Sequence, residues 1–306
     1  GSEVCAEEAV AQAASNGPNE NYARELMELH TLGVDHLYTQ NDVVQASRAL
    51  TGWTFDRRPK GRYQFRFVPA LHWEGDKEFL GHSLVEARRP DARQGEQILH
   101  ILGSHEITAE FVCTKLVRAL AADQPPKVLV RAATEAWRTS SGHLPTVIRA
   151  IVEHPAFYDP ALYRAKVKTP WEFVVSALRI TDAELPRPVE ILRALTVMGQ
   201  PLYHCEVPTG WPEGADDWLD PGAMAYRWEF ASQLSEGRFK GARIPASFFL
   251  ETLDGLPLRQ WPQALEQRIL PGGVGERTHA ALVQAVEDFR AEEPGKRRRP
   301  LKQLAP

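Results

Sequence analysis

Apolar residues along most of the chain recur at helical rather than alternating spacing, and several segment boundaries carry residues typical of helix ends. Thr39 is followed by Asp42, and Thr169 is followed by Pro170 and Glu172. A hydroxyl at the cap and a carboxylate three residues later can each accept an N–H that the first helical turn leaves unpaired. Helices are therefore predicted to begin after both threonines, and NENYARELMELHTLGV to form a helix ending at a glycine. Further helices are expected at about 92–102, 108–121, 127–139, 145–153, 187–198, 221–235, 246–253, 259–269 and 275–291.

Two segments depart from helical spacing. In GRYQFRFVPALHWEGDKEFLG, Tyr63, Phe65 and Phe67 alternate with polar residues, which predicts a small hairpin or extended ribbon at about 62–80. The segment at about 203–220 is irregular and dense in Pro, Gly and Trp, and long ordered loops of this kind are often functional. The pattern as a whole predicts a mainly α, multi-helix domain with an inserted β-ribbon and a long Trp-rich loop.

The same pattern suggests four parts of the chain. We expect a disordered or partly helical lead-in at 1–17, a helical core at 18–238, C-terminal helices packed on that core at 239–292, and a basic tail at 293–306. The tail GKRRRPLKQLAP is more typical of a solvated end than of a partner-binding arm.

Composition narrows the class of protein. The 306 residues are 43% hydrophobic and 25% charged, as in soluble globular proteins, and the formal net charge of −4 argues against a nucleic-acid partner. The cysteines Cys5, Cys113 and Cys205 are too few and too widely spaced for a disulfide framework. No apolar run is long enough to span a bilayer, and the opening residues do not have the pattern of a signal peptide.

The first helix carries a polar stripe. At about 100° per residue, Asn21, Glu25 and Glu28 fall on one side of it. Two close carboxylates can act as acid and base or bind a metal, because their proton affinities are driven apart. The alternative is an ordinary helix surface, with Arg24 and Glu28 forming a surface ion pair and His30 in the core.

Two further clusters are candidates for chemistry. His72 lies near Asp76 and Lys77 and can bind a divalent metal or transfer protons, although turns also collect such residues to satisfy their backbones. Cationic residues ending at Lys168 precede the Thr169 helix and can hold an anion or remain solvated. The P-loop, HExxH, GxSxG and GxGxxG motifs are absent, which disfavours simple nucleotide, zincin and serine-hydrolase functions.

The segment PNENYARELMELHTLGVDHLYTQNDVVQASRALTGW resembles the signature of a bacterial family of unknown function, the domain family numbered 1800. The later motifs FRFVPALHWEGDKEFLG, ITAEFVCTKLVRAL, HPAFYDPALYRAKVKTPWEFVVSALR and MGQPLYHCEVPTGWPEGADDWLDPGAMAYRWEFA follow in the same order. The resemblance runs from about Pro18 to Ala231, with a weaker continuation to about 290. It implies a mainly helical fold and an exported or periplasmic location, but no defined activity.

The resemblance also directs attention to particular residues. The positions that match recurring motif positions are Asn21, Arg24, Glu25, Glu28, His72, Lys77, Lys115, Lys168, Gly210, Trp211 and Arg227. Two departures stand out. The family's helical region before the first motif is reduced here to about 17 residues, as in a fragment or shortened member, and His72-Trp73 replaces the family's usual His-Asp.

The leading hypothesis is an exported or envelope-associated enzyme, a hydrolase, acting on a glycan or another polar polymer. Glu25 or Glu28 would be the acid or base, and His72 would assist proton transfer or bind a divalent metal. A polymeric or anionic ligand would contact Asn21, Arg24, Lys77, Lys168, Trp211, Trp218 and Arg227, with the two tryptophans as stacking surfaces. The alternatives are a non-catalytic scaffold or binding module and a metal-dependent redox protein.

Overall fold

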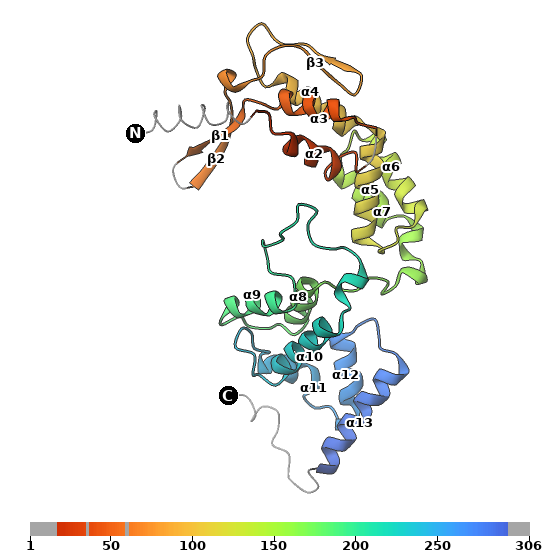
Figure 1. Cartoon of the computed structure of the whole chain (residues 1–306). Helices are drawn as coiled ribbons and strands as arrows, with labels where there is room; N and C mark the ends of the chain where they lie inside the picture. Colours follow the sequence, from red (N-terminus) through yellow and green to blue (C-terminus); the bar gives the residue numbers. More distant parts are fainter. Residues whose placement is uncertain (1–16, 35–36, 59–60, 293–306) are drawn as a thin grey trace. The chain divides into compact units, whose positions relative to one another are not determined.

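The structure is a computed structural model that describes residues 17–34, 37–58 and 61–292 (Figure 1). The predicted lead-in up to residue 16 and the predicted basic tail lie outside the described residues. The chain forms two compact units, Gly1–Lys166 and Val167–Pro306. The predicted domain boundaries at residues 17, 238 and 292 stay predictions.

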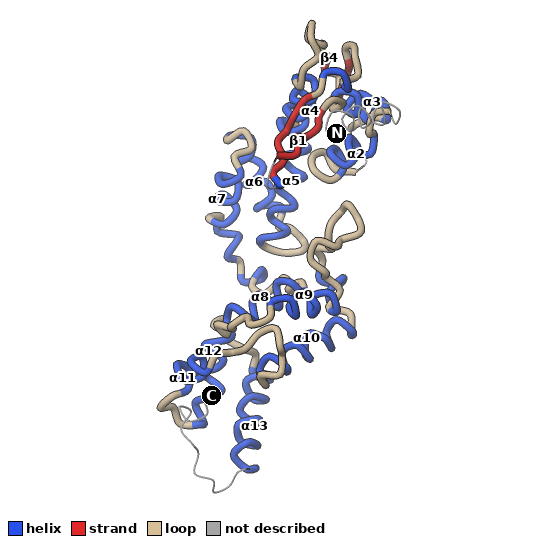
Figure 2. The backbone as a smooth tube through the Cα atoms, turned by 90° about the vertical axis from the view of Figure 1, so that its left-hand side faces the viewer, coloured by secondary structure: helices blue, strands red, loops and turns tan. Residues whose placement is uncertain are grey.

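The mainly α fold is confirmed, and Figure 2 shows the strands (red) only in the N-terminal unit. The α-helices of this unit are α2 (Glu20–Glu28), α3 (Gln40–Ala49), α4 (Arg93–Ser104), α5 (Glu106–Leu120), α6 (Lys127–Thr139) and α7 (Leu144–Val152). Its strands are β1 (Trp53–Arg58), β2 (Arg62–Phe67), β3 (Lys77–Phe79) and β4 (His82–Leu84). Short 3-10 helices are η2 (Pro69–Leu71), η3 (Pro155–Tyr158) and η4 (Pro160–Leu162).

The C-terminal unit is built from helices and loops. Its α-helices are α8 (Pro170–Ile180), α9 (Pro188–Val197), α10 (Pro221–Ser235), α11 (Ala246–Leu253), α12 (Trp261–Ile269) and α13 (Glu276–Glu292). Two 3-10 helices, η5 (Ala215–Trp218) and η6 (Leu258–Gln260), interrupt its loops. The predicted Trp-rich loop is irregular until η5, as expected. The core of this unit contains Val174, Leu178, Ile191, Leu195, Met198, Phe230, Leu234 and Ala242.

Both predicted helix starts are confirmed in detail. Thr39 and Asp42 form a capping box at α3, and Thr169 and Glu172 form one at α8. In each box the threonine hydroxyl accepts the N–H of the third helical residue, whose carboxylate accepts the threonine N–H. Because these contacts are local in sequence, the pattern of residues was sufficient to predict them.

The predicted β-ribbon at about 62–80 is confirmed, and it is made of parts of two separate hairpins. In the first, β2 pairs antiparallel with β1, a strand that lies earlier in the chain than the predicted segment. In the second, β3 pairs with β4. The chain enters β1 through Gly52, which has φ +83°, and a Cβ there would lie 2.8 Å from the Phe67 ring. Gly52 therefore lets the turn and the ring pack closely.

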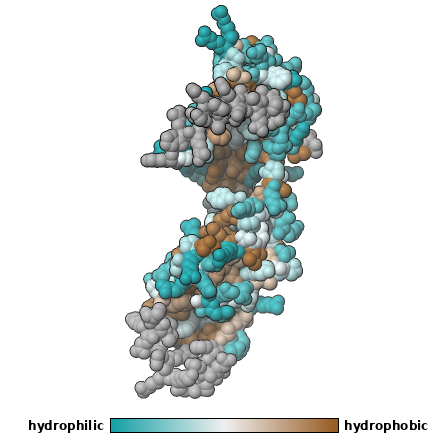
Figure 3. All heavy atoms as spheres, turned by 60° about the vertical axis from the view of Figure 1, so that its left-hand side comes forward, coloured by the Kyte–Doolittle hydropathy of each residue, from teal (hydrophilic) through white to brown (hydrophobic). Residues whose placement is uncertain are grey.

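Two apolar clusters form the interior of the N-terminal unit. One joins α2, α3 and α4 to the second hairpin and contains Ala23, Met27, Leu32, Val43, Ala46, Ala49, Phe79, Leu84, Ile98 and Leu102. The other lies among α5, α6 and α7 and contains Cys113, Val117, Ala121, Leu129, Ala133, Val147 and Ile151. Figure 3 shows apolar side chains (brown) among polar ones (teal) on one face of this unit, in the upper part of the view.

The prediction that His30 belongs to the core is wrong, because His30 is exposed. Helix α2 ends at Glu28, so His30 lies in the following turn and no longer has the helical direction that the spacing assumed. Among the described residues, no helix is both long and apolar enough to cross a membrane.

Asp42 connects the start of α3 to the second hairpin. Besides closing the capping box, its carboxylate accepts the N–H of Leu80 at 2.9 Å. Partial burial acts to raise the pKa of Asp42, but the hydrogen bonds from Thr39 and Leu80 outweigh it and hold that pKa below its usual value. The ionised carboxylate therefore stabilises the folded N-terminal unit.

Asp42→Ala should lower the free energy of unfolding by about 2 kcal/mol at neutral pH, because it removes the cap and leaves the Leu80 N–H unpaired. Since the folded pKa is depressed, this contribution is present above about pH 4 and is lost as the pH falls through the folded value. Urea unfolding at pH 7 and at acid pH measures both effects. Asn41→Ala, an exposed change on the same helix, is the control, and equal effects of the two variants would contradict the assignment.

Candidate functional site

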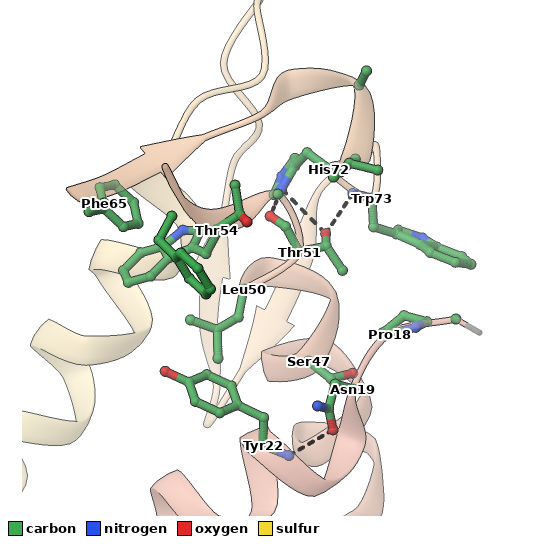
Figure 4. A pocket seen from close by; sticks show the side chains of 16 residues that line it. Pro18, Asn19, Tyr22, Ser47, Leu50, Thr51, Thr54, Phe65, His72 and Trp73 are labelled. Atoms are coloured by element: carbon green, nitrogen blue, oxygen red, sulfur yellow. Dashed lines mark hydrogen bonds between the residues drawn. The ribbon is translucent and has the colours of Figure 1, made fainter. Parts of the chain in front are cut away.

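An open pocket of about 710 Å³ lies in the N-terminal unit (Figure 4). Its walls come from the start of α2, the end of α3, the first hairpin and the segment following η2. The lining residues are Gly17, Pro18, Asn19, Tyr22, Ser47, Leu50, Thr51, Gly52, Trp53, Thr54, Phe55, Phe65, Ala70, Leu71, His72 and Trp73. They mix aromatic rings with hydroxyl and amide groups, and within the described part of the chain the lining includes no aspartate or glutamate.

The aromatic rings of the pocket are unusually accessible. Tyr22, Phe55, Phe65 and Trp73 are between 45% and 62% exposed. Figure 4 shows Phe65 and Trp73 on different walls of the pocket, with Leu50 and Tyr22 between and below them. Exposed aromatic side chains gathered in one concave site are typical of ligand-binding surfaces, because they bury a large area at a small entropic cost.

Trp53 holds the first hairpin against the rest of the unit. Its ring packs so closely on Gly95 of α4 that a Cβ on Gly95 would lie 2.6 Å from it. On the other side Trp53 meets Phe65 edge to face, with ring centroids 5.1 Å apart. The hairpin wall of the pocket is therefore fixed by a glycine that leaves room for an indole.

Behind the wall formed by segment 70–73 lies a buried polar network centred on Gln94. The Gln94 Nε2 donates to Leu84 O at 2.8 Å and to Gly75 O at 3.3 Å, which fixes the orientation of the amide. The Gln94 Oε1 therefore faces two donors, Lys77 Nζ at 2.6 Å and His72 Nε2 at 3.0 Å. The network joins α4 to the second hairpin and to the pocket wall.

Both ring nitrogens of His72 face oxygen atoms that accept hydrogen bonds. Nε2 lies against the Gln94 amide oxygen, and Nδ1 lies 2.8 Å from Thr51 O. In this arrangement His72 is engaged with protein atoms, and its predicted role as a proton carrier or metal ligand stays a prediction.

Lys77 is the most enclosed cation near the pocket, with only 4% of its surface exposed. Its three N–H donors reach Trp73 O at 2.6 Å, Gly75 O at 2.8 Å and the Gln94 amide oxygen. Burial lowers the pKa of Lys77, and the nearby carboxylates Glu86 and Asp76 act in the opposite direction. Lys77 thus fixes the loop behind Trp73 and does not offer its ammonium group to a ligand.

Trp73 is held by its backbone and by a cation. Its N–H donates to Thr51 Oγ1 at 2.7 Å, a contact drawn in Figure 4, and the Arg48 guanidinium lies 4.8 Å from its ring centroid. Arg48 Nε is buried and has no hydrogen-bond partner. Among the described residues no carboxylate pairs with Arg48, so a cation stands beside an exposed indole at the pocket wall.

The predicted acid–base residues of α2 lie outside the pocket lining. Glu28 accepts a hydrogen bond from Tyr38 Oη at 3.0 Å and lies 3.6 Å from Arg24 Nη1. Arg24 also donates to Gln40 Oε1 at 2.8 Å. These contacts connect α2 to the start of α3 and favour the structural alternative for Glu28, while Asn21 is exposed and Glu25 half-buried on the same helix.

The remaining candidates belong to the C-terminal unit. Arg227 is buried and donates to Lys168 O at 2.7 Å and to Trp218 O at 3.4 Å. Burial lowers the pKa of Arg227, and Asp220 opposes this effect. Trp218 is itself buried, and Trp211 is partly buried, with its ring centroid 6.4 Å from that of Trp218. This group anchors the Trp-rich loop to α10, and its predicted role in binding stays a prediction.

Metal ligation has no obvious site in the described part of the chain, and the buried Cys113 is not suited to thiol chemistry. No group of three or more His, Cys, Asp or Glu side chains there is placed to hold a metal ion. Cys113 is buried, and this burial raises the pKa of its thiol to about 11, so the thiol is protonated and unreactive near neutral pH.

The sequence pattern indicated His72 and Lys77, but it did not indicate the other residues that form the pocket wall and the polar network behind it. Trp53 and Phe55 were not predicted to face Phe65, because β1 was not recognised as a strand. The sequence does not indicate the role of Gln94 in the network, because Gln94 is one polar residue in the first turn of an amphipathic helix. The alternation of aromatic residues at 63–67 was the signal that could have been followed back to β1.

Lys77→Met should lower the free energy of unfolding by about 2–4 kcal/mol, because one buried and two partly buried oxygens lose this donor. Glu78→Gln is the matched control, since Glu78 is the exposed neighbour on the same strand. Its effect should stay within about 0.5 kcal/mol. Urea unfolding followed by circular dichroism makes the comparison. Equal midpoints for both variants would show that Lys77 has no structural role.

A comparison of the sequence with protein families identifies the family of this chain. The family described as "Protein of unknown function (DUF1800)" matches residues 10–304, which extends the resemblance found in the motifs to nearly the whole chain. The comparisons with curated proteins and with solved structures found no match. This chain therefore belongs to the DUF1800 family.

Proposed function

We propose that this protein binds a glycan chain in the pocket of its N-terminal unit. The observation that carries the proposal is the lining of that pocket, in which accessible aromatic rings alternate with hydroxyl and amide groups. The exported or envelope location implied by the family resemblance would bring the pocket into contact with cell-surface glycans.

The chemistry of the lining suits a sugar on two counts. A pyranose has apolar C–H faces that can stack on rings such as Trp73 and Phe65, which are both accessible from the pocket. Its hydroxyl groups need partners that both donate and accept hydrogen bonds, and the side chains of Asn19 and Thr54 supply such groups in the lining. A mostly apolar pocket with a few polar groups is the usual form of a small-ligand site.

The geometry supports binding better than hydrolysis at this pocket. Glycoside hydrolysis generally uses two carboxyl groups that flank the scissile bond. No aspartate or glutamate is among the described residues that line the pocket, and Glu28 is engaged with Tyr38 and Arg24. The binding-module alternative is therefore preferred over the hydrolase, and catalysis by Glu25 or Glu28 stays a prediction.

Three hexasaccharides test the proposal: chitohexaose, β-1,4-linked mannohexaose and β-1,4-linked hexamannuronate. At least one should bind with a Kd below about 1 mM and change the tryptophan fluorescence, since Trp53 and Trp73 line the pocket. Trp73→Ala and Phe65→Ala should each weaken that binding by about threefold to tenfold, because each removes a stacking ring. Isothermal titration calorimetry on the full chain measures the affinities.

The controls separate the pocket from the rest of the surface. Tyr158→Ala removes an exposed ring that lines a second pocket of the same unit, of about 490 Å³, and should leave binding unchanged. Glu28→Gln should also leave binding unchanged, because Glu28 does not line the pocket. The proposal fails if none of the three hexasaccharides binds, or if Tyr158→Ala weakens binding as much as Trp73→Ala does.

A further inference from the structure

The first hairpin presents a row of aromatic rings on one face. In its register, Trp53 is opposite Phe67 and Phe55 is opposite Phe65, and alternate residues of a strand share a face. Tyr63 continues the row, with its ring centroid 5.1 Å from that of Phe55. The other face is polar and includes Gln64 and the Arg66–Asp56 ion pair at 3.1 Å.

This aromatic face is continuous with the pocket. Trp53, Phe55 and Phe65 belong both to the row and to the pocket lining. Tyr63 extends the row beyond the pocket and is 62% exposed. Strands of six residues are about 20 Å long, so the row is long enough to contact several units of a polymer. Figure 1 shows the hairpin projecting from its unit, and the side chains of Phe55, Tyr63 and Phe65 are exposed.

The hairpin also differs from the rest of the chain in charge. The sequence has five basic residues and one acidic residue, Asp56, within 53–67, in a chain whose formal net charge is −4. In the register Arg57 is opposite Tyr63 and belongs to the aromatic face, whereas Arg62 and Arg66 share the polar face with Gln64. At the other end of the pocket, Arg48 lies against Trp73, and no carboxylate of the described residues pairs with it. Basic residues, Arg57 and Arg48, therefore occupy the two ends of a binding surface whose described pocket lining contains no carboxylate.

Resting on the glycan-binding function proposed above, we infer that the ligand is an acidic glycan whose chain runs from Trp73 and Arg48 through the pocket and along the aromatic face of the first hairpin. Stacking on the rings provides affinity for the sugar faces, and the arginines attract the carboxylates or phosphates of the chain. Single-stranded nucleic acid also combines stacking with negative charge. The hydroxyl and amide lining of the pocket and the negative net charge of the chain favour the glycan.

The test compares ligands that differ in one property at a time. Hexamannuronate and mannohexaose share their linkage and length and differ in the carboxylates. The acidic hexamer should bind at least about fivefold more tightly at low salt, and this advantage should shrink as salt is added, because exposed charges are screened. Dimannuronate should bind more weakly than the hexamer, since it cannot reach both the pocket and the hairpin face.

Variants assign the effect to particular residues. Arg57→Gln should weaken binding of the acidic hexamer by about threefold and leave the neutral hexamer unchanged, because Arg57 is opposite Tyr63 in the register and belongs to the aromatic face. Arg62→Gln removes the same charge from the polar face and should have a clearly smaller effect. Tyr63→Ala should weaken binding of the hexamer but not of the dimer, since Tyr63 lies beyond the pocket. Gln64→Ala, a change on the opposite face, is the matched control and should have no effect.

Each contrary result has its own meaning. Equal affinity for the acidic and neutral hexamers would overturn this inference and leave glycan binding intact. Equal affinity for the acidic dimer and hexamer would show that the hairpin face is not used and would also overturn it. Binding of hexathymidylate with no binding of any glycan would overturn both this inference and the proposed function, and would identify a single-stranded nucleic acid as the ligand class.

Discussion

The pocket depends on one buried cation, the ammonium group of Lys77. Its three N–H groups are fully used by Trp73 O, Gly75 O and the Gln94 amide oxygen. Because Gln94 also contacts His72, the same network joins helix α4, the second hairpin and the wall that presents Trp73. Taking a charge out of water is costly unless its hydrogen bonds are replaced. Here three protein oxygens replace the water around the Lys77 ammonium group. These contacts form a rigid support behind the exposed indole of Trp73.

The first hairpin is the opposite case, an element whose apolar face is left uncovered. A hairpin alone has too little buried surface to be stable, so it needs contact with other elements. Gly52 and Gly95 provide this contact, because the absence of a side chain lets Phe67 and Trp53 pack against the backbone. The anchored end of the hairpin is thus fixed while Phe55, Tyr63 and Phe65 stay accessible. The chain has a negative net charge. Exposed apolar surface of this kind is usually a surface that binds a ligand or a partner and is not part of the folded core.

Sequence alone predicted most of the helices and little of the site, for a physical reason that particular residues illustrate. The caps at Thr39 and Thr169 involve residues three apart, so their consequence is visible in the sequence. His30 was misplaced because the helix ends two residues before it, and a helical spacing says nothing about the direction of a turn. The partners of Lys77 are as far away as Gln94, and only the folded chain brings these two side chains together. The strand β1 was missed because its polar positions include Asp56 and two arginines, which hid its pairing with the aromatic strand β2.

The central claim is that ligands bind to the pocket of the N-terminal unit rather than to the Trp-rich loop of the other unit. Nitrogen-15 labelling of the indole groups tests it most directly, because the two sites contain different tryptophans. In a titration with hexamannuronate followed by NMR spectroscopy, the indole N–H signals of Trp53 and Trp73 should shift progressively while those of Trp211 and Trp218 remain in place. Shifts confined to Trp211 and Trp218 would contradict the account and return the site to the Trp-rich loop.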